Sequence, residues 1–288
     1  MVLVTAWDDG HMQRTLTASL DLRVHDRADL IFSIAVAGGT PLASERLQVR
    51  SSDGPCAVTE ILGPDDTRLH RVIAEPGRLQ VDYEAVVVGQ AVPRAVDPLE
   101  TVTALRPSRY CESDALFSLA RSELGYLLEH RRLHEDGTVS GGLQILPWVA
   151  AWVGRHLSYV SGSTTVSDSA VSTLAGGQGV CRDFAHLTIA MLRALDIPAR
   201  YAAVYAPGLV PMDFHAVAEG FVDGAWHVVD ATGLAPRQSL VRIATGRDAA
   251  DVAWLSNHHG NVTVEDMRID ALIDDLPTDD PSQPVVLA

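Results

Sequence analysis

The sequence has few cysteines and no long apolar segment. Its 288 residues include three cysteines, Cys56, Cys111 and Cys181, which lie far apart and form no Cys-x-x-Cys pair. An odd, scattered set argues against a disulfide framework and fits a reducing compartment. No stretch approaches the roughly 20 apolar residues of a membrane span, and no N-terminal segment combines basic residues with an apolar run. We therefore expect a cytoplasmic chain that does not associate with a membrane.

Positive charge is also scarce. The chain has 22 basic and 37 acidic residues, a formal net charge of −15 and an isoelectric point near 5.0. Such a chain repels a nucleic-acid backbone and is not attracted to an anionic membrane surface. This charge excludes nucleic-acid binding and favours cationic or neutral partners. With 47% hydrophobic residues, the chain can bury the core of one large domain or of two.

Short segments with alternating apolar and polar residues fill residues 12–97. Turn sequences rich in glycine, proline and aspartate separate them, which is typical of antiparallel strands. Residues 91–109 carry three prolines without a clear period and mark a connection. Beyond it, helix and strand patterns alternate. The expected fold class is therefore α+β, with an N-terminal antiparallel β-sandwich domain at residues 1–97 followed by a second domain at residues 98–288.

A glycine-rich segment, residues 176–180, leads directly into a helical pattern that begins at Cys181. Apolar residues recur at helical spacing through residue 195, so the thiol lies on the stripe expected to face the core. A thiol at a helix N-terminus meets unsatisfied N–H groups and the positive end of the helix dipole, which favour the thiolate. The glycines allow those N–H groups to approach a substrate oxygen. The alternative is a structural cysteine, because free cysteines commonly act as small buried hydrophobes.

A cysteine nucleophile needs a base and a third group that orients the base. The dipeptide Asp223-Gly224 predicts a two-residue hairpin turn between two strands. In that register Asp230 lies diagonal to His215 on the same face of the sheet, close enough to accept a hydrogen bond from the imidazole. Each residue alone has a structural alternative, because a strand histidine can simply be hydrogen-bonded and an aspartate at a strand end can form a turn.

Other residues compete for these roles. His227 falls on the opposite face of the hairpin, and His186 lies about 140° around the helix from Cys181, so both are poorly placed as the base. Asp213 is a rival for Asp230 as the orienting group. If the hairpin loop has three residues, a slip of one position sends Asp230 to the other face.

Three motifs, in this order, resemble the transglutaminase-like superfamily of cysteine enzymes. They are Gly179-Val180-Cys181-Arg182-Asp183-Phe184-Ala185, Asp213-Phe214-His215-Ala216 and Trp226-His227-Val228-Val229-Asp230-Ala231-Thr232. The segments 107–114, 197–201 and 246–252 are also similar to this family. Its bacterial members of the cysteine protease type carry an N-terminal β-rich region.

This resemblance implies a papain/transglutaminase-like cysteine-protease core, with Cys181 as nucleophile, His215 as base and Asp230 as orienting residue. The animal enzymes have Gln-Cys-Trp where this chain has Val180-Cys181-Arg182. The resemblance therefore does not extend to the residues around the cysteine of the glutamine-crosslinking enzymes.

The implied chemistry is acyl transfer on a protein or peptide substrate. The Cys181 thiolate attacks a carboxamide or peptide carbonyl, its own N–H helps to hold the oxyanion, and His215 protonates the departing nitrogen. Tyr159 and Gln178 are candidates for the second oxyanion donor. Water then releases the thioester in a protease or amidase, and a primary amine releases it in a transglutaminase. This scheme requires no metal or organic cofactor.

Two other functions compete with this hypothesis. A metal hydrolase could use His130 and His134, which are spaced i, i+4, or the adjacent His258 and His259, although both pairs lie in polar surroundings typical of a solvated face. A catalytically silent transglutaminase-like protein-interaction module is the second alternative, because a fold alone does not establish activity. Thiol labelling separates the cases, since an activated Cys181 should react below the pH expected of an ordinary thiol. The sequence leaves the oligomeric state open.

Overall fold

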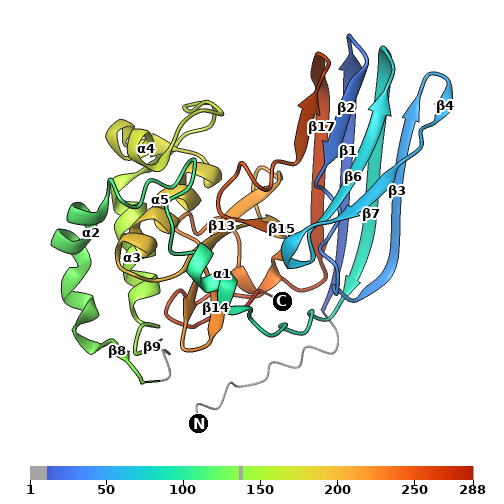
Figure 1. The fold of residues 1–288 in the computed structure, drawn as a ribbon. Coiled ribbons are helices and arrows are strands. Elements are labelled where there is room, and N and C mark those ends of the chain that lie inside the picture. Colours follow the sequence, from blue (N-terminus) through green and yellow to red (C-terminus); the bar gives the residue numbers. More distant parts are fainter. Residues whose placement is uncertain (1–11, 136–138, 288) are drawn as a thin grey trace.

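The computed structural model describes residues 12–135 and 139–287. In Figure 1 the long strands form one group, and most of the helices lie together beside a smaller sheet, on the side away from the long strands. The strands of the first group pair antiparallel to one another and build two sheets. The first contains, in order, β17 (Val262–Ile273), β1 (Gln13–Val24), β7 (Gly77–Val88), β3 (Leu42–Ser51) and β4 (Gly54–Pro55). The second contains β16 (Leu255–His258), β2 (Ala28–Phe32), β6 (Arg68–Ala74) and β5 (Thr59–Leu62).

The alternating sequence pattern explains how these strands pack. On β1, Leu16, Ala18, Leu20 and Leu22 are all at most 1% exposed, whereas the residues between them are less buried. Successive side chains of a strand point to opposite faces, so each strand buries one apolar face. The predicted N-terminal antiparallel sheets are therefore confirmed.

The two N-terminal sheets also take strands from the other end of the chain. β17 pairs with β1 along its whole length, and β16 pairs with β2. The sheets therefore combine residues before position 89 with residues after position 254. The division into domains at residues 1–97 and 98–288 stays a prediction.

The second group is built on a four-stranded antiparallel sheet. Its order is β14 (Ala225–Val229), β13 (His215–Val222), β12 (Ala199–Tyr205) and β15 (Val241–Gly246). Short pairs and turns connect the remaining elements: β8 (Arg132–Leu133) with β9 (Val139–Ser140), β10 (Ser158–Tyr159) with β11 (Gln178–Gly179), and the 3₁₀ turns η2 (Pro64–Asp66), η3 (Gly125–His130) and η4 (Arg237–Ser239). The helices are α1 (Pro98–Thr103), α2 (Phe117–Leu124), α3 (Ile145–His156), α4 (Ala170–Gly176) and α5 (Cys181–Ala194). Within the described part of the chain, none of these helices has the length and apolar character needed to cross a membrane.

Helix α5 lies at the centre of this group. It packs against β13, β12, α3 and α4, and residues 183–194 are all buried. The sequence predicts an amphipathic helix with one buried stripe, but even its polar side chains are enclosed. Arg193 donates hydrogen bonds to the carbonyl oxygens of Ala199, Arg106 and Arg247 and to the hydroxyl of Ser108. These acceptors satisfy a buried guanidinium that would otherwise be costly.

The C-terminal tail packs against the smaller sheet. Val285 and Leu287 are buried in an apolar cluster with residues of β12, β13 and β14, and the N–H of Val228 donates to the carbonyl of Val285 at 2.7 Å. Arg237 binds the carboxylate of Asp279 and the carbonyl oxygens of residues 280 and 283.

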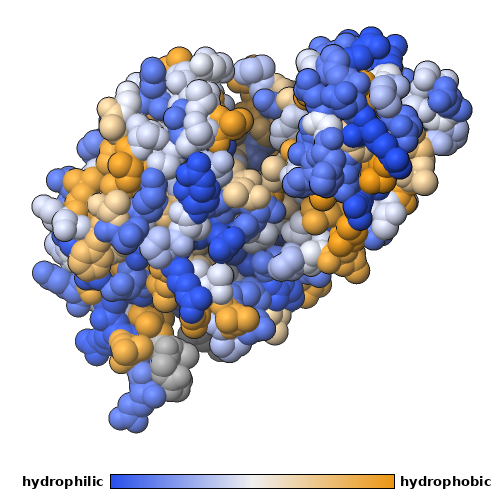
Figure 2. Space-filling model, turned by 45° about the horizontal axis from the view of Figure 1, so that its top comes forward, coloured by the Kyte–Doolittle hydropathy of each residue, from blue (hydrophilic) through white to orange (hydrophobic). Residues whose placement is uncertain are grey.

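On another part of the surface, Figure 2 shows a hollow between the helical group and the N-terminal sheets.

Candidate active site

The start of α5 is held by a carboxylate and by a close approach of the backbone. Oδ2 of Asp183 accepts the N–H of Val180 at 2.9 Å, and this side chain is fully buried. The preceding turn fits tightly, because a Cβ on Gly179 would lie only 2.7 Å from Cβ of Asp183. These contacts fix the direction in which Cys181, the first residue of the helix, presents its thiol and its N–H. That N–H is among the helix donors that have no carbonyl partner within the helix.

Residues 160–168 are tied to the same helix end. The guanidinium of Arg182 donates to the carbonyl of Thr165 at 2.7 Å and pairs with Asp183 at 2.8 Å. The hydroxyl of Thr164 donates to the other oxygen of the Asp183 carboxylate at 2.7 Å. The residue that follows Cys181 therefore anchors a neighbouring loop.

Tyr159 lies against the cysteine. The parallel pair β10–β11 places Tyr159 opposite Gly179, two residues before Cys181, and the pKa of the tyrosine hydroxyl responds to both the backbone and the side chain of Cys181. Burial and the nearby sulfur raise the pKa of Tyr159 to about 12. The hydroxyl therefore keeps its proton at neutral pH and can act as a hydrogen-bond donor. Gln178, the other predicted oxyanion donor, has an exposed side chain on β11.

The hairpin has the register that the sequence predicts. Val222 faces Ala225 and Phe221 faces Trp226 across the Asp223-Gly224 turn. Both turn residues have positive φ, 51° and 85°, as a tight two-residue hairpin turn requires. The aromatic rings of Phe221 and Trp226 lie 5.2 Å apart.

This register brings His215 and Asp230 together. Nε2 of His215 and Oδ2 of Asp230 are 3.0 Å apart, and both side chains are at most 2% exposed. The other carboxylate oxygen, Oδ1, accepts the N–H and the hydroxyl of Thr232 at 2.8 and 2.7 Å. The carboxylate therefore has partners on both oxygens and a fixed orientation.

Cys181 also acts on the His215 ring. Burial alone would lower the pKa of His215, but the hydrogen bond with Asp230 and the interaction with the nearby Cys181 raise it to about 10. Burial would raise the pKa of Asp230, but the hydrogen bond and charge of His215 hold it below its usual range. The imidazole is therefore expected to be positively charged at neutral pH, with a carboxylate and a sulfur nearby.

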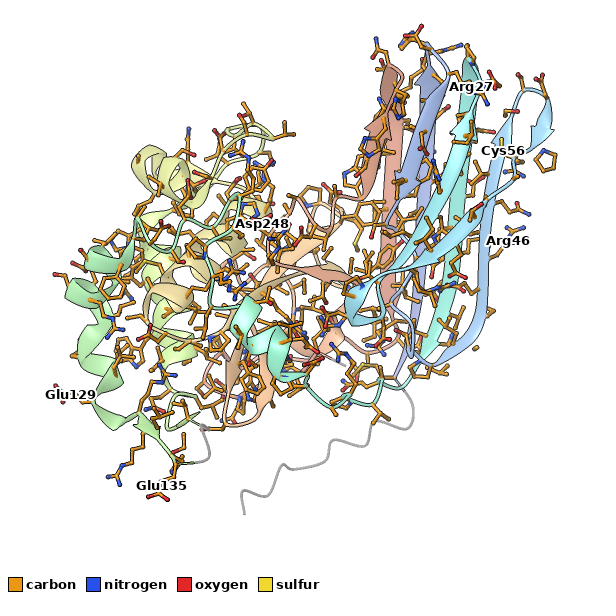
Figure 3. All side chains as sticks on the ribbon, viewed as in Figure 1. Arg27, Arg46, Cys56, Glu129, Glu135 and Asp248 are labelled. Atoms are coloured by element: carbon orange, nitrogen blue, oxygen red, sulfur yellow. The ribbon has the colours of Figure 1, made fainter. Side chains whose placement is uncertain are left out.

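The structure thus gathers Cys181, His215, Asp230 and Tyr159 in one place. The other histidines considered in the sequence have different partners. His227 contacts the carbonyl of Val222, and His186 stacks on Tyr110 and accepts the N–H of Ala249. Asp248, labelled in Figure 3, accepts the N–H of Tyr110, whose ring stacks on His186.

Two contributors to the site were missed in the sequence. Asp183 occupies the third position of α5, where an acidic residue commonly accepts the N–H that precedes the helix. Thr232 follows Asp230 by two residues, the spacing at which an aspartate side chain accepts a local N–H. Both signals were present in the sequence and could have been used.

Three of the four histidines considered for a metal site have side chains that the structure describes. Among the residues that the structure describes, no group of three or more His, Cys, Asp or Glu side chains is placed to hold a metal ion. His134 contacts the hydroxyl of Ser140 at 2.8 Å, and the rings of His258 and His259 lie 6.5 Å apart. The side chain of His130 lies outside the described residues.

Comparisons with known proteins agree with this architecture. Residues 142–231 match the family model of the transglutaminase-like superfamily. The crystal structure of a protein from Cytophaga hutchinsonii, described as a "putative cysteine protease", superposes with a TM-score of 0.81. Its sequence is 33% identical, and the match covers 93% of this chain and 92% of that one.

Curated relatives match over a shorter region. An uncharacterized protein of Mycobacterium leprae is 30% identical over 128 residues, which cover 42% of this chain and 46% of the relative. An uncharacterized protein of Mycobacterium tuberculosis is 33% identical over 125 residues, which cover 38% of this chain and 40% of the relative. The match therefore spans less than half the length of these relatives.

Proposed function

Since the chain belongs to the transglutaminase-like superfamily, we propose that it is a cysteine enzyme that transfers acyl groups from peptide or carboxamide bonds. The observation that carries this proposal is the position of His215, whose Nε2 is hydrogen-bonded to Asp230 and whose pKa is raised by both Asp230 and the nearby Cys181. Such an arrangement supplies a nucleophile, a proton carrier and a group that orients the carrier. Its substrate would be a protein or a peptide.

The proposed reaction begins with attack of the Cys181 sulfur on the substrate carbonyl carbon. The N–H of Cys181 and the hydroxyl of Tyr159 donate to the oxygen that becomes negative. Collapse of the tetrahedral intermediate breaks the C–N bond while His215 gives its proton to the departing nitrogen. Asp230 keeps the imidazole oriented during this transfer. The product of this half-reaction is a thioester on Cys181 and a free amine or ammonia.

The thioester can be released in two ways. Water gives a carboxylic acid, which is hydrolysis, and a primary amine gives a new amide, which is transglutamination. In either case His215 accepts a proton from the incoming nucleophile and returns it to the sulfur. All 22 basic residues of the chain are arginines. Because this chain has no lysine of its own, amine-linked products must come from an added amine, from a lysine of a substrate peptide or from an α-amino group.

The experiment that tests this proposal incubates the protein with a mixed peptide library, with and without a primary amine. Mass spectrometry then identifies cleaved, deamidated and amine-linked peptides. We expect at least one of these products, and a thioester adduct on Cys181 when the reaction is stopped early. A protein that forms neither product nor adduct, and labels at Cys181 only after denaturation, would instead be an interaction module.

The pH dependence of Cys181 alkylation should depend on Asp230. With Asp230 present, the imidazole stays positive up to about pH 10 and can stabilise a negative sulfur throughout the neutral range. In Asp230→Ala that hydrogen bond is lost and burial lowers the pKa of His215, so the positive charge disappears at a lower pH. We therefore expect iodoacetamide to label the variant more slowly at pH 6–7, and we expect weak residual turnover. Identical pH profiles for the two proteins would contradict this role.

The reducing compartment expected from the sequence remains part of the proposal. Cys56, Cys111 and Cys181 are all free thiols. A free, reactive nucleophilic cysteine is readily lost to oxidation outside a reducing environment. This supports a cytoplasmic location.

A further inference from the structure

Asp230 lies just beyond the end of a strand. β14 ends at Val229, which faces Ala218 in the last register pair with β13. His215, the partner of Asp230, lies at the start of β13, three positions before Ala218. The hydrogen bonds between these two strands therefore end before they reach Asp230, and its position depends on other contacts as well.

The C-terminal tail, residues 279–287, supplies contacts on the other side of β14. β14 is an edge strand of its sheet, with β13 on one side. The N–H of Val228 donates to the carbonyl oxygen of Val285 at 2.7 Å, and Nη1 of Arg237 donates to the carbonyl oxygen of Val228 at 3.3 Å. Both backbone polar groups of a residue two positions before Asp230 are therefore bonded to the tail or to Arg237.

The tail also packs on the face of the sheet that carries the two catalytic side chains. Val217 follows His215 by two positions on β13, and side chains two positions apart project to the same face. Val228 precedes Asp230 by the same interval at the end of β14. One buried apolar cluster contains both valines together with Leu287 of the tail.

Arg237 holds the tail in this position. Its side chain, in η4, is 9% exposed, and Nε and Nη2 bind the two carboxylate oxygens of Asp279 at 2.9 Å each. Nη2 also donates to the carbonyl oxygens of Asp280 at 2.7 Å and Gln283 at 3.0 Å. A guanidinium that binds a carboxylate through two nitrogens has a fixed geometry. One arginine therefore joins β14 to the tail.

The space behind Asp230 is not filled. A cavity of about 390 Å³ lies between α3, the tail and residues 227–233. Helix α3 approaches this segment closely, since a Cβ on Gly154 would lie 3.1 Å from the carbonyl oxygen of Ala231. Protein interiors contain few voids larger than a water molecule. Side-chain packing leaves the segment free on the side of the cavity, and the hydrogen bonds from the tail limit its movement.

We propose that the C-terminal tail, held by Arg237, is a positioning element of the catalytic site that keeps Asp230 within hydrogen-bond distance of His215. This inference rests on the proposed acyl-transfer function, in which Asp230 orients the base. Thr232 fixes one oxygen of the carboxylate, but it belongs to the same segment and moves with Asp230. Arg237 acts through β14 and is a positioning residue.

The first test measures the pKa of His215 and needs no turnover. Protein labelled with ¹⁵N-histidine is titrated by NMR between pH 6 and pH 10, and the His215 signals are identified by their absence from His215→Ala. Arg237→Met removes the guanidinium, and Asp279→Asn weakens its ion pair from the more exposed end. Arg68→Met is the matched control, because Arg68 also binds carboxylates, lies in the N-terminal sheets and has a side chain that is 18% exposed.

We expect the pKa of His215 to fall by about one pH unit in Arg237→Met and by less in Asp279→Asn. A displaced Asp230 makes a weaker charge-assisted hydrogen bond, and burial of the imidazole then lowers its pKa. Arg237→Lys, which keeps the positive charge, should restore part of the wild-type value. Arg68→Met should lower the melting temperature without changing this pKa.

Two results of this titration overturn the proposal. In the first, Arg237→Met lowers the melting temperature and leaves the pKa of His215 unchanged, so that the tail contributes to stability alone. In the second, Arg68→Met lowers the pKa equally, so that the effect comes from general destabilisation. If Arg237→Met does not fold, Asp279→Asn decides by the same criteria.

The second test measures kcat and KM for a peptide that the wild type processes. Arg237→Met should lower kcat by about tenfold and leave KM nearly unchanged, because a displaced carboxylate disturbs the base and not the binding of substrate. The same substitution should have no further effect in Asp230→Ala, which lacks the carboxylate that the tail positions. An equal loss of kcat in both backgrounds overturns the inference, because the tail would then act on another group. If the wild type shows no turnover at all, the proposed function fails, while the pKa of His215 still decides whether the tail positions Asp230.

Discussion

Replacing Cys181 by alanine should abolish turnover while leaving the protein folded. The side chain lies at the first position of α5 and is only partly buried, so its loss leaves no large cavity. Removal of the nucleophile eliminates the thioester route, and in enzymes whose catalytic residues act as a unit such losses reach about 10⁴-fold or more. His215→Ala should have a similar effect, because it removes the group that carries the proton. Product formation from the peptide library, measured beside circular dichroism and the melting temperature, checks this result.

The matched control for this experiment is Cys56→Ala. Cys56 is also a partly buried free thiol, and Figure 3 shows it on the N-terminal sheets, well away from the start of α5. This variant should keep full activity. If Cys181→Ala retained wild-type activity, the cysteine could not be the nucleophile and the proposed mechanism would have to be abandoned.

Replacing Glu219 by glutamine should strongly destabilise the fold. Glu219 is completely buried on β13, where its carboxylate binds Arg200 at 2.8 Å and both terminal nitrogens of Arg242, also at 2.8 Å. Breaking a buried ion pair on one side leaves uncompensated charge and costs about 3–5 kcal/mol. We expect the melting temperature to fall by on the order of 10 °C, as measured by calorimetry.

The pH dependence of this difference has a definite sign. Burial opposes ionisation of Glu219, but the two arginines lower its pKa to about 2 from the usual 4.5. Its contribution to stability is therefore complete above pH 4.5 and declines as the pH falls toward 2. The wild type and Glu219→Gln should differ most near neutral pH and converge in acid. Glu84→Gln, which removes an exposed pair with Arg46, should change stability little. Equal stability of wild type and Glu219→Gln at pH 7 would contradict the assignment.

The same ion network reaches beyond the smaller sheet. Arg200 also contacts Asp65 at 3.1 Å and Glu100 at 3.4 Å, and Arg94 bridges those two carboxylates. These contacts connect β12 with η2, which lies among the N-terminal strands, and with α1. A loss of Glu219 would therefore weaken the contact between the two groups of elements as well as the sheet itself.

The pairing of His215 with Asp230 could be predicted because it depends on local rules. A two-residue turn fixes the register of a hairpin, and the register decides which side chains share a face. The contact of Tyr159 with Cys181 follows no local rule. It depends on the pairing of β10 with β11, two short strands that are separated by α4. Sequence reasoning named Tyr159 and Gln178 together and could not choose between their positions.

The complete burial of α5 could not be predicted from its own sequence. His186 and Arg193 interrupt the apolar pattern of the helix, and aromatic rings and distant carbonyl groups enclose them. The pairing partners of β16 and β17 could not be predicted from the sequence either. Alternating residues indicate a strand, but they do not say which of many strands it pairs with.

The pairing of β17 with β1 has a consequence for the synthesis of this protein. The two strands lie more than 200 positions apart in the chain, so the ribosome must add more than 200 further residues before β1 acquires this neighbour. Until then one edge of the first sheet stays open, and an open edge is a template for aggregation. A recombinant fragment that ends at residue 97 would retain that open edge permanently, and a chain that includes β17 is the safer choice for expression.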